Sequence, residues 1–285
     1  MRFLDKIIHA LGFRTDEYEK YASYARDLVL PSRLVNRDKN GVRDQASLNR
    51  NLRLYLGFAR KMLIDDKRIG HTFVERNALK SAPEDYAGVL QVGYNLGLDF
   101  HELKRLSMEL LGVLDYCDPE YRKQYGVPVF NLLTSFQTVF AVFAIMVGTH
   151  CPDDAIRHFI SFTGDPGQDV LFDRLAQKLE PNRRIGTELK ISRHYRLLVS
   201  ALDAIPADQP ALVKKFLDGW YAKVHAPQGA VKPDSDGYTG YWSWEAALVV
   251  MLFNIDDSSF RDHKYYPDQL VANYRAGEAE YGQSQ

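Results

Sequence analysis

The chain has 285 residues, of which 46% are hydrophobic and 26% are charged, and its formal net charge is −1. This composition excludes general disorder, and the near-neutral charge gives no support for nucleic-acid binding by the chain as a whole. The length exceeds that of most single domains, so we expect one large domain or two closely packed ones.

The chain begins with the pattern of an amphipathic helix. Its apolar residues recur on one helical face, at Phe3, Leu4, Ile7, Ile8 and Leu11. Polar residues interrupt this run, which disfavours a secretory signal peptide. We expect the apolar face to dock onto the rest of the protein, with an amphipathic helix on a membrane surface as the alternative.

Helical periodicity returns between Leu48 and Leu63, and again from Glu84 to about Tyr116. Pro83 is expected in the first turn of the second segment, where its missing N–H costs nothing. A break is expected at Gly97 to Asp99, since glycine and aspartate favour turns.

The stretch from Gln124 to Pro152 contains no formally charged residue. It predicts a central core helix from about Pro128 to Gly148. A membrane span is the alternative, because the stretch is about as long as a bilayer is thick. Polar residues between Asn131 and Thr138 dilute its apolar character and favour the core helix.

The second half repeats the helical pattern over shorter segments separated by turns. Helices are expected over residues 152–162, 169–179, 195–205, 212–224 and 243–254 and after Pro267, with a long loop at 226–241. Segments with period two are few. The sequence therefore predicts an all-α fold of nine or ten short-looped helices. We expect an N-terminal helical region at 1–125 and a C-terminal helical domain at 126–285, closely packed on the first.

Only two cysteines occur, Cys117 and Cys151. One disulfide between them is conceivable, but two cysteines in a chain this long do not form a disulfide framework. A reducing compartment, the cytoplasm, is therefore the expected location.

Charge is distributed unevenly along the chain. From Ala226 to Gln285 nine acidic residues face four basic ones, so this tail carries −5 and the remaining 225 residues carry +4. An acidic end attracts a basic partner and repels nucleic acid. An ordinary solvated acidic surface is the alternative interpretation.

One set of residues is compatible with a metal-dependent nuclease: Asp169, Glu188 and Lys190 form an acid followed by Glu-x-Lys. Such a site needs acids to hold a hard cation and a lysine beside the attacking water or the phosphate. It also needs Glu-x-Lys on a strand, which the pattern here does not predict. The alternative is that Asp169 caps a helix while Glu188 and Lys190 lie on the surface.

A calcium loop is a second metal hypothesis, with Asp234, Asp236 and Glu245 at the first, third and twelfth positions. Thr239 occupies the sixth position, where the turn needs glycine, so an ordinary turn is favoured. Glu245 lies in an apolar helix and needs a hydrogen-bonding partner if it is buried. The eight histidines lack zinc-site spacing. We therefore expect no metal, no cofactor and no enzymatic activity.

Several motifs of the second half occur together in one order: Pro152–Ile156, Gly167–Asp169 with Asp173 to Leu175, Trp220-Tyr221, Gly240–Ala247, Asp256–Ser259 and Tyr265–Pro267. In this order and spacing they resemble the PoNi-type immunity proteins, the cytoplasmic antitoxins of PoNe-type DNase toxins in polymorphic-toxin and type VI secretion systems. The first 120 residues match only loosely. The resemblance implies an all-helical protein without catalytic residues, which binds and neutralises a cognate DNase toxin.

We expect the helix core, Trp244 to Phe253, to be structural and its flanks to bind the partner, because aromatic residues beside charges are common at binding hot spots. The expected partner-binding residues are Asp234, Asp236, Tyr238, Tyr241, Asp256, Asp257 and Asp262. The expected partner is the toxin protein, without direct nucleic-acid or membrane binding, and a homodimer is left open. The alternatives are the nuclease and a helical scaffold for another protein.

Overall fold

The computed structural model describes residues 37, 52–53, 56–57, 59–60, 78–229, 231–232 and 238–283. The chain forms two compact units, Met1–Gln124 with Val231–Gly240, and Tyr125–Ala230 with Tyr241–Gln285. The helix expected at the N-terminus lies outside the described residues, whereas those described between 52 and 60 are helical, as expected.

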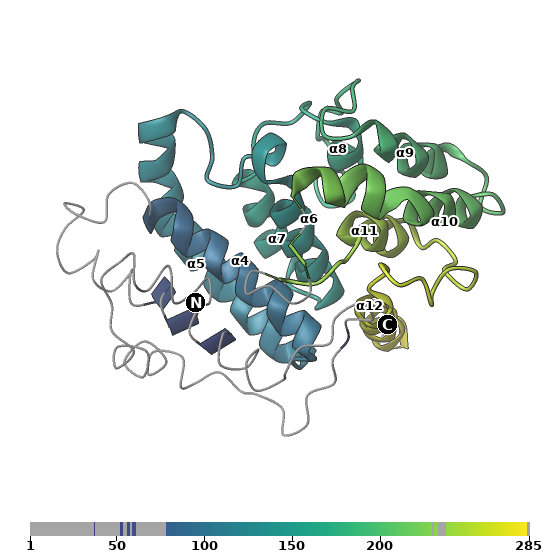
Figure 1. The fold of residues 1–285 in the computed structure, drawn as a ribbon, viewed down its shortest axis with the longest axis horizontal. Coiled ribbons are helices and arrows are strands. Elements are labelled where there is room, and N and C mark those ends of the chain that lie inside the picture. Colours follow the sequence, from purple (N-terminus) through teal and green to yellow (C-terminus); the bar gives the residue numbers. More distant parts are fainter. Residues whose placement is uncertain are drawn as a thin grey trace. The chain divides into compact units, whose positions relative to one another are not determined.

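Two long helices dominate the described part of the first unit: α4 (Ala78–Leu96) and α5 (Phe100–Tyr125) (Figure 1). The break predicted between them is confirmed, and Gly97 adopts φ +80° there, a backbone conformation that favours glycine. The predicted start at Pro83 is wrong, because α4 begins five residues earlier and includes this proline at the loss of one backbone hydrogen bond. The end predicted near Tyr116 is also wrong, since α5 continues through Pro119 to Tyr125.

The described residues of the second unit form seven α-helices: α6 (Leu132–Gly148), α7 (Asp153–Ser161), α8 (Val170–Ala176), α9 (Arg196–Asp203), α10 (Gln209–Trp220), α11 (Trp244–Phe253) and α12 (Asp268–Gln283). A 3₁₀ turn, η2 (Arg193–Tyr195), precedes α9. A π-helical turn, η3 (Tyr221–His225), and a 3₁₀ turn, η4 (Ala226–Gln228), follow α10. The described residues contain no strand, so the all-α prediction is confirmed.

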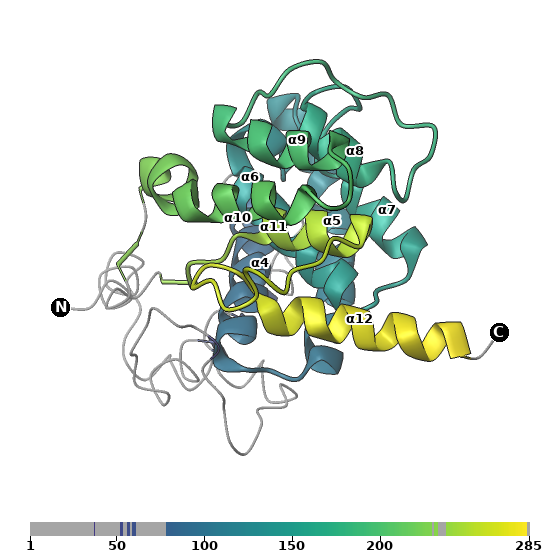
Figure 2. The same cartoon turned by 90° about the vertical axis from the view of Figure 1, so that its right-hand side faces the viewer.

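The core of the second unit is built around α6 and α11. Helix α6 begins after Asn131, whose side chain accepts a hydrogen bond from the Leu133 N–H, and its residues from Val139 to Gly148 are all buried. It packs against α7, α11 and α12, and α11 lies between α10 and α12 (Figures 1 and 2). The predicted core helix is therefore confirmed, with its start at Leu132.

Close approach of α12 to α6 depends on a glycine. A Cβ at Gly148 would lie 2.4 Å from Leu270 Cδ1, so only glycine allows this contact without a shift of the packing.

Both cysteines, Cys117 and Cys151, are buried, and no disulfide joins them. Within the described part of the chain, no helix has the length and the apolar character that a membrane crossing requires.

Candidate functional site

Glu245 is the one acidic residue of α11, and its carboxyl lies in the core of the second unit. The indole N–H of Trp220, at the end of α10, donates a hydrogen bond of 2.7 Å to Glu245 Oε1. The partner that a buried Glu245 requires is therefore present. Burial raises the pKa of Glu245 to about 7, although the Trp220 N–H and the hydroxyls of Tyr195 and Ser243 favour the carboxylate.

Trp220 also belongs to a cluster of five rings, which we call the aromatic cluster: Trp220, Tyr221, His225, Tyr241 and Tyr265. Trp220 stacks on His225 with 4.9 Å between ring centroids. Tyr221 stacks on Tyr265 at 5.5 Å and meets Tyr241 edge-on at 5.1 Å. Three chain segments thus contribute rings to one place: the end of α10 with η3, the residues before α11, and those before α12.

The π-helical turn η3 carries two of these rings, those of Tyr221 and His225. It follows α10 directly and spans Tyr221–His225, so it places Tyr221 and His225 at its two ends. Both side chains are partly exposed, whereas Trp220, Tyr241 and Tyr265 are buried. Single π-helical turns are rare and often occur at functional sites.

His225 is an uncharged member of the cluster at neutral pH. Burial lowers its pKa to about 4. A neutral ring nitrogen accepts hydrogen bonds, which agrees with the 3.2 Å between Gln137 Nε2, on α6, and His225 Nδ1. His225 therefore adds no charge to the aromatic cluster at neutral pH.

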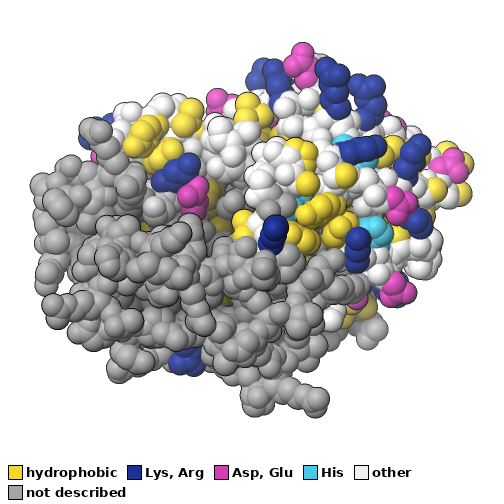
Figure 3. Space-filling view, in the orientation of Figure 1, with side chains coloured by type: hydrophobic (Ala, Val, Ile, Leu, Met, Phe, Trp, Pro, Cys, Tyr) yellow, Lys and Arg dark blue, Asp and Glu magenta, His cyan; other side chains and the backbone are white. Residues whose placement is uncertain are grey.

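Charged residues border the aromatic cluster. His263 Nε2 lies 3.6 Å from Asp218 Oδ1, and Lys264 Nζ lies 4.7 Å from the centre of the Tyr265 ring. On the face shown in Figure 3, hydrophobic and histidine side chains of the second unit lie beside Lys, Arg, Asp and Glu side chains. An aromatic centre with a polar rim is typical of protein–protein interfaces.

The acidic turn, Asp256–Ser259, joins α11 to the segment before α12. Asp256 is exposed, and its carboxylate accepts hydrogen bonds from the Ser258 N–H at 3.0 Å and the Ser258 hydroxyl at 2.8 Å. These bonds lower the pKa of Asp256. Its charge therefore faces solvent at neutral pH.

Asp257 has a different environment from its neighbour, because its side chain is only 1% exposed. Its Oδ1 accepts hydrogen bonds from Arg261 at 2.6 Å and from Arg275 of α12 at 2.7 Å, and Oδ2 accepts one from the Tyr266 hydroxyl at 3.1 Å. Burial alone would raise the pKa of Asp257, but the two guanidinium groups hold it below its usual value. Asp257 thus links the acidic turn to α12.

The predicted partner-binding residues are found in several environments. Asp256 and Asp262 are exposed, while Asp257, Tyr238 and Tyr241 are buried. Tyr238 belongs to the first unit and Tyr241 to the second. Asp234 and Asp236 lie outside the described residues. Tyr221, His225 and Tyr265 were not predicted as site residues, although the Trp-Tyr pair at 220–221 is a visible signal in the sequence.

The residues of the nuclease hypothesis have structural roles. Asp169 caps α8, with Oδ1 accepting from the Leu171 N–H at 3.0 Å and Oδ2 accepting from the Lys190 N–H at 2.8 Å. Glu188 and Lys190 are exposed and form a surface ion pair of 3.0 Å. Residues 187–191 form no strand, contrary to what this hypothesis requires. The alternative interpretation, a helix cap with surface charges, is confirmed.

The calcium-loop hypothesis also lacks support, because the Glu245 carboxyl is bonded to Trp220 in the core. Among the residues that the structure describes, no group of three His, Cys, Asp or Glu side chains is arranged to hold a metal ion.

Comparison with known proteins agrees with the motifs noted in the sequence. The model of the family described as PoNe immunity proteins (PoNi), C-terminal, matches residues 167–270, so the resemblance is confirmed for this part of the chain. The crystal structure of protein PA2201 from Pseudomonas aeruginosa is similar in fold, with a TM-score of 0.61, 16% sequence identity and coverage of 92% of this chain and 97% of that one. No curated protein matches the chain.

Proposed function

We propose that this protein is a cytoplasmic immunity protein that binds a bacterial DNase toxin directly and neutralises it, protecting the cell that produces the toxin. The observation that carries the proposal is the family match at residues 167–270. The matched segment extends from the start of α8 into α12 and includes the aromatic cluster and the acidic turn. A toxin of a type VI or other polymorphic-toxin system is the class of partner that we propose.

The proposed role sets the affinity that the surface must provide. One free nuclease molecule can damage a chromosome, so inhibition requires a dissociation constant on the order of nanomolar, or about −12 kcal/mol. Interfaces of that strength bury about 800 Å² per partner and depend on a few central aromatic or arginine residues. Tyr221 and His225, the partly exposed rings of the aromatic cluster, supply such a centre.

Charge supports a nuclease as the partner. DNases bind a polyanion in a basic cleft, so an inhibitor with exposed acids is steered towards that cleft and competes with DNA. Asp256 and Asp262 are exposed acids on the segment between α11 and α12. We propose that these two carboxylates face the toxin, while Asp257 positions the turn through its bonds to Arg261 and Arg275.

A co-expression experiment tests the proposal. The product of the neighbouring gene, as the candidate toxin, is expressed in a heterologous bacterium with and without the protein, and survival and chromosome integrity are measured. We expect rescue by the wild-type chain and a stable complex of the two purified proteins. Light scattering on the same samples measures whether the chain is a monomer or a homodimer before it binds. Absence of a complex at micromolar concentration would overturn the proposal.

A further inference from the structure

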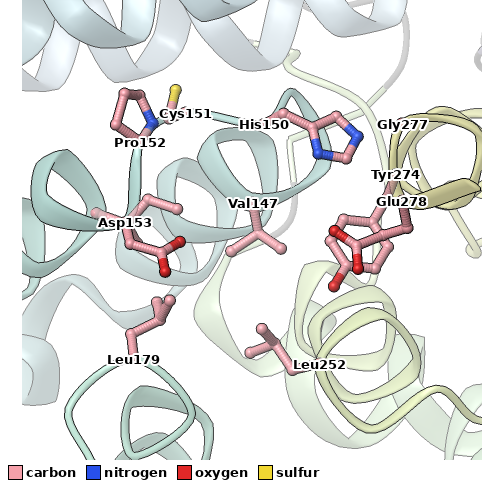
Figure 4. Close-up of a pocket in the computed structure, with 11 residues that line it drawn as sticks. Val147, His150, Cys151, Pro152, Asp153, Leu179, Leu252, Tyr274, Gly277 and Glu278 are labelled. Atoms are coloured by element: carbon pink, nitrogen blue, oxygen red, sulfur yellow. The ribbon is translucent and has the colours of Figure 1, made fainter. Parts of the chain in front are cut away.

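A cavity of about 730 Å³ opens on the second unit between the end of α6, the start of α7, α11 and α12 (Figure 4). Apolar side chains from three parts of the chain form much of its wall: Val147, Ile156, Leu179 and Leu252. Pockets of about 300–1,000 Å³ hold drug-sized ligands. The cavity therefore has room for a long side chain together with part of the backbone that carries it.

The backbone at the C-terminal end of α6, at His150 and Cys151, forms part of the cavity wall. His150 adopts φ +55°, while the N–H groups of His150 and Cys151 return to the carbonyls of Val147 and Met146. This is the Schellman arrangement, in which glycine usually occupies the position of His150. A histidine here costs strain of about 1–2 kcal/mol relative to glycine.

The imidazole of His150 connects α6 to α12. It stacks on the Tyr274 ring with 5.5 Å between centroids and 4° between planes, and Nε2 lies 3.3 Å from the Asn273 carbonyl oxygen. A Cβ at Gly277 would lie 2.2 Å from His150 Nε2, so glycine is required for this contact. The stacked rings therefore join the end of α6 to α12 at one side of the cavity.

Two carboxylates lie at opposite sides of the cavity. Figure 4 shows Asp153, from α7, on one side and Glu278, beside Tyr274 on α12, on the other. Both acids are exposed at the rim. Burial raises the pKa of Tyr274, and the charges of Glu278 and Asp153 raise it further, so the negative potential of both carboxylates reaches the tyrosine hydroxyl.

The residues that line the cavity favour an organic cation over a metal or an anion. They include no Lys or Arg among the described residues, and Arg157, one turn further along α7, contacts the Leu179 carbonyl oxygen at 3.5 Å. The N-terminus of α7 would attract an anion, but Asp153 and Asp154 already occupy its first turn. The described residues also lack a metal-binding group of three ligands.

We propose that this cavity receives an arginine side chain from a basic segment of the toxin. The apolar wall packs against the aliphatic stem, and the positive charge of the guanidinium lies in the field of the Asp153 and Glu278 carboxylates, either of which can accept its paired hydrogen bonds. A guanidinium suits this site better than an ammonium because its planar fork matches a carboxylate and because it is less strongly hydrated beside an apolar wall. The identity of the partner rests on the proposed function, whereas the chemistry of the cavity does not.

The first experiment probes the cavity without any toxin. The full-length protein is titrated with Nα-acetyl-arginine amide and with Nα-acetyl-citrulline amide, an uncharged analogue of nearly the same shape, while NMR follows the ring signals of His150 and Tyr274. We expect arginine-dependent shifts, with binding at least tenfold weaker for citrulline. The variant Asp153→Asn/Glu278→Gln should lose this preference. Equal shifts with the two amides, or shifts with neither, would overturn the proposal.

The second experiment measures toxin affinity with a matched control. Asp165→Asn/Asp208→Asn removes two exposed acids elsewhere on the second unit and changes the net charge equally. We expect a dissociation constant at least tenfold higher for the cavity variant and little change for the control. If the wild-type chain binds the toxin and both variants bind equally well, the cavity inference fails and the proposed function stands.

Failure of the wild-type chain to bind the toxin would overturn the proposed function and the toxin as the occupant of the cavity. Circular dichroism establishes that the variants fold. If the double variant loses its helical spectrum, Glu278→Gln alone replaces it in both experiments, and the same results are required of it.

Discussion

Asp256 and Asp257 are adjacent in the chain and differ in what their carboxylates contact. Asp256 is exposed and bonds only within its own turn, to Ser258, whereas Asp257 is buried and accepts hydrogen bonds from Arg261, Arg275 and Tyr266. Removing a carboxylate from such a buried network leaves its donors unsatisfied, whereas exposed positions tolerate substitution. The two positions therefore separate a stability effect from a binding effect.

We predict that Asp257→Ala lowers the free energy of unfolding by about 2 kcal/mol, because the Tyr266 hydroxyl and two arginines lose their acceptor. Asp256→Ala should change it by less than about 0.5 kcal/mol. Urea titration of both variants measures the difference. Since the folded-state pKa of Asp257 is depressed, its contribution is present above the ordinary aspartate value of 3.8 and is lost as the pH falls through the folded-state value. Equal urea midpoints for both variants at pH 7 would contradict this.

The contribution of Glu245 to folding stability should change with pH in the direction opposite to that of Asp257. Its pKa rises from 4.5 to about 7 on folding, so the unfolded chain releases this proton at a lower pH than the folded one. Folding stability from this group therefore decreases as the pH rises from about 4.5 to 7, by at most about 3 kcal/mol. Glu245→Gln keeps an acceptor for Trp220 and removes the titration. In thermal melts, the melting temperature of the variant relative to that of the wild type should be higher at pH 8 than at pH 5. If the melting temperatures of the two proteins change with pH in parallel, the effect is excluded.

At the scale of elements, α6 and α12 pack closely because Gly148 has no side chain. We predict that Gly148→Ala destabilises the protein by about 1–3 kcal/mol, since its Cβ would lie 2.4 Å from Leu270 Cδ1. The matched control is Gly112→Ala in α5, where nothing lies within 4 Å of the added Cβ. At Gly112 the higher helix propensity of alanine should raise the free energy of unfolding by about 0.5–1 kcal/mol. Thermal unfolding of the two variants should shift in opposite directions; shifts of the same sign would contradict the packing argument.

Elements with strong local signals were predictable from the sequence. The uncharged stretch gave α6, Asp169 gave the start of α8, and Pro152 and Pro267 preceded α7 and α12 as expected. The start of α4 was missed because tertiary packing outweighs the cost of one proline inside a helix.

The candidate site was less predictable because burial at a turn depends on distant residues. The partners of Asp257 include Arg275, eighteen positions further along the chain, so the sequence alone gives no sign that this acid is buried. The cavity beside α12 likewise combines residues from 147–156, 179, 252 and 274–278, which tertiary packing alone brings together.

At the scale of the whole molecule, the aromatic and the acidic residues of the proposed binding surface should affect different rates. The aromatic ring should slow dissociation from the toxin, and the exposed acids should speed association. We predict that Tyr221→Ala raises the dissociation rate from the toxin at least tenfold, because it removes a partly exposed ring of the aromatic cluster. Asp256→Asn/Asp262→Asn should instead lower the association rate severalfold at low salt, with the difference vanishing at high salt. Surface plasmon resonance at two ionic strengths measures both rates. Wild-type kinetics in all variants would place the toxin on another face.

The most direct test of the central claim is to purify the product of the neighbouring gene, as the candidate nuclease, and to measure its affinity for this protein and the inhibition of its DNA cleavage. Our account predicts a stable complex with a dissociation constant on the order of nanomolar and loss of DNA cleavage at one equivalent of the protein. A nuclease that continues to cut DNA in the presence of a micromolar excess of the folded chain, with no complex detected, would contradict it.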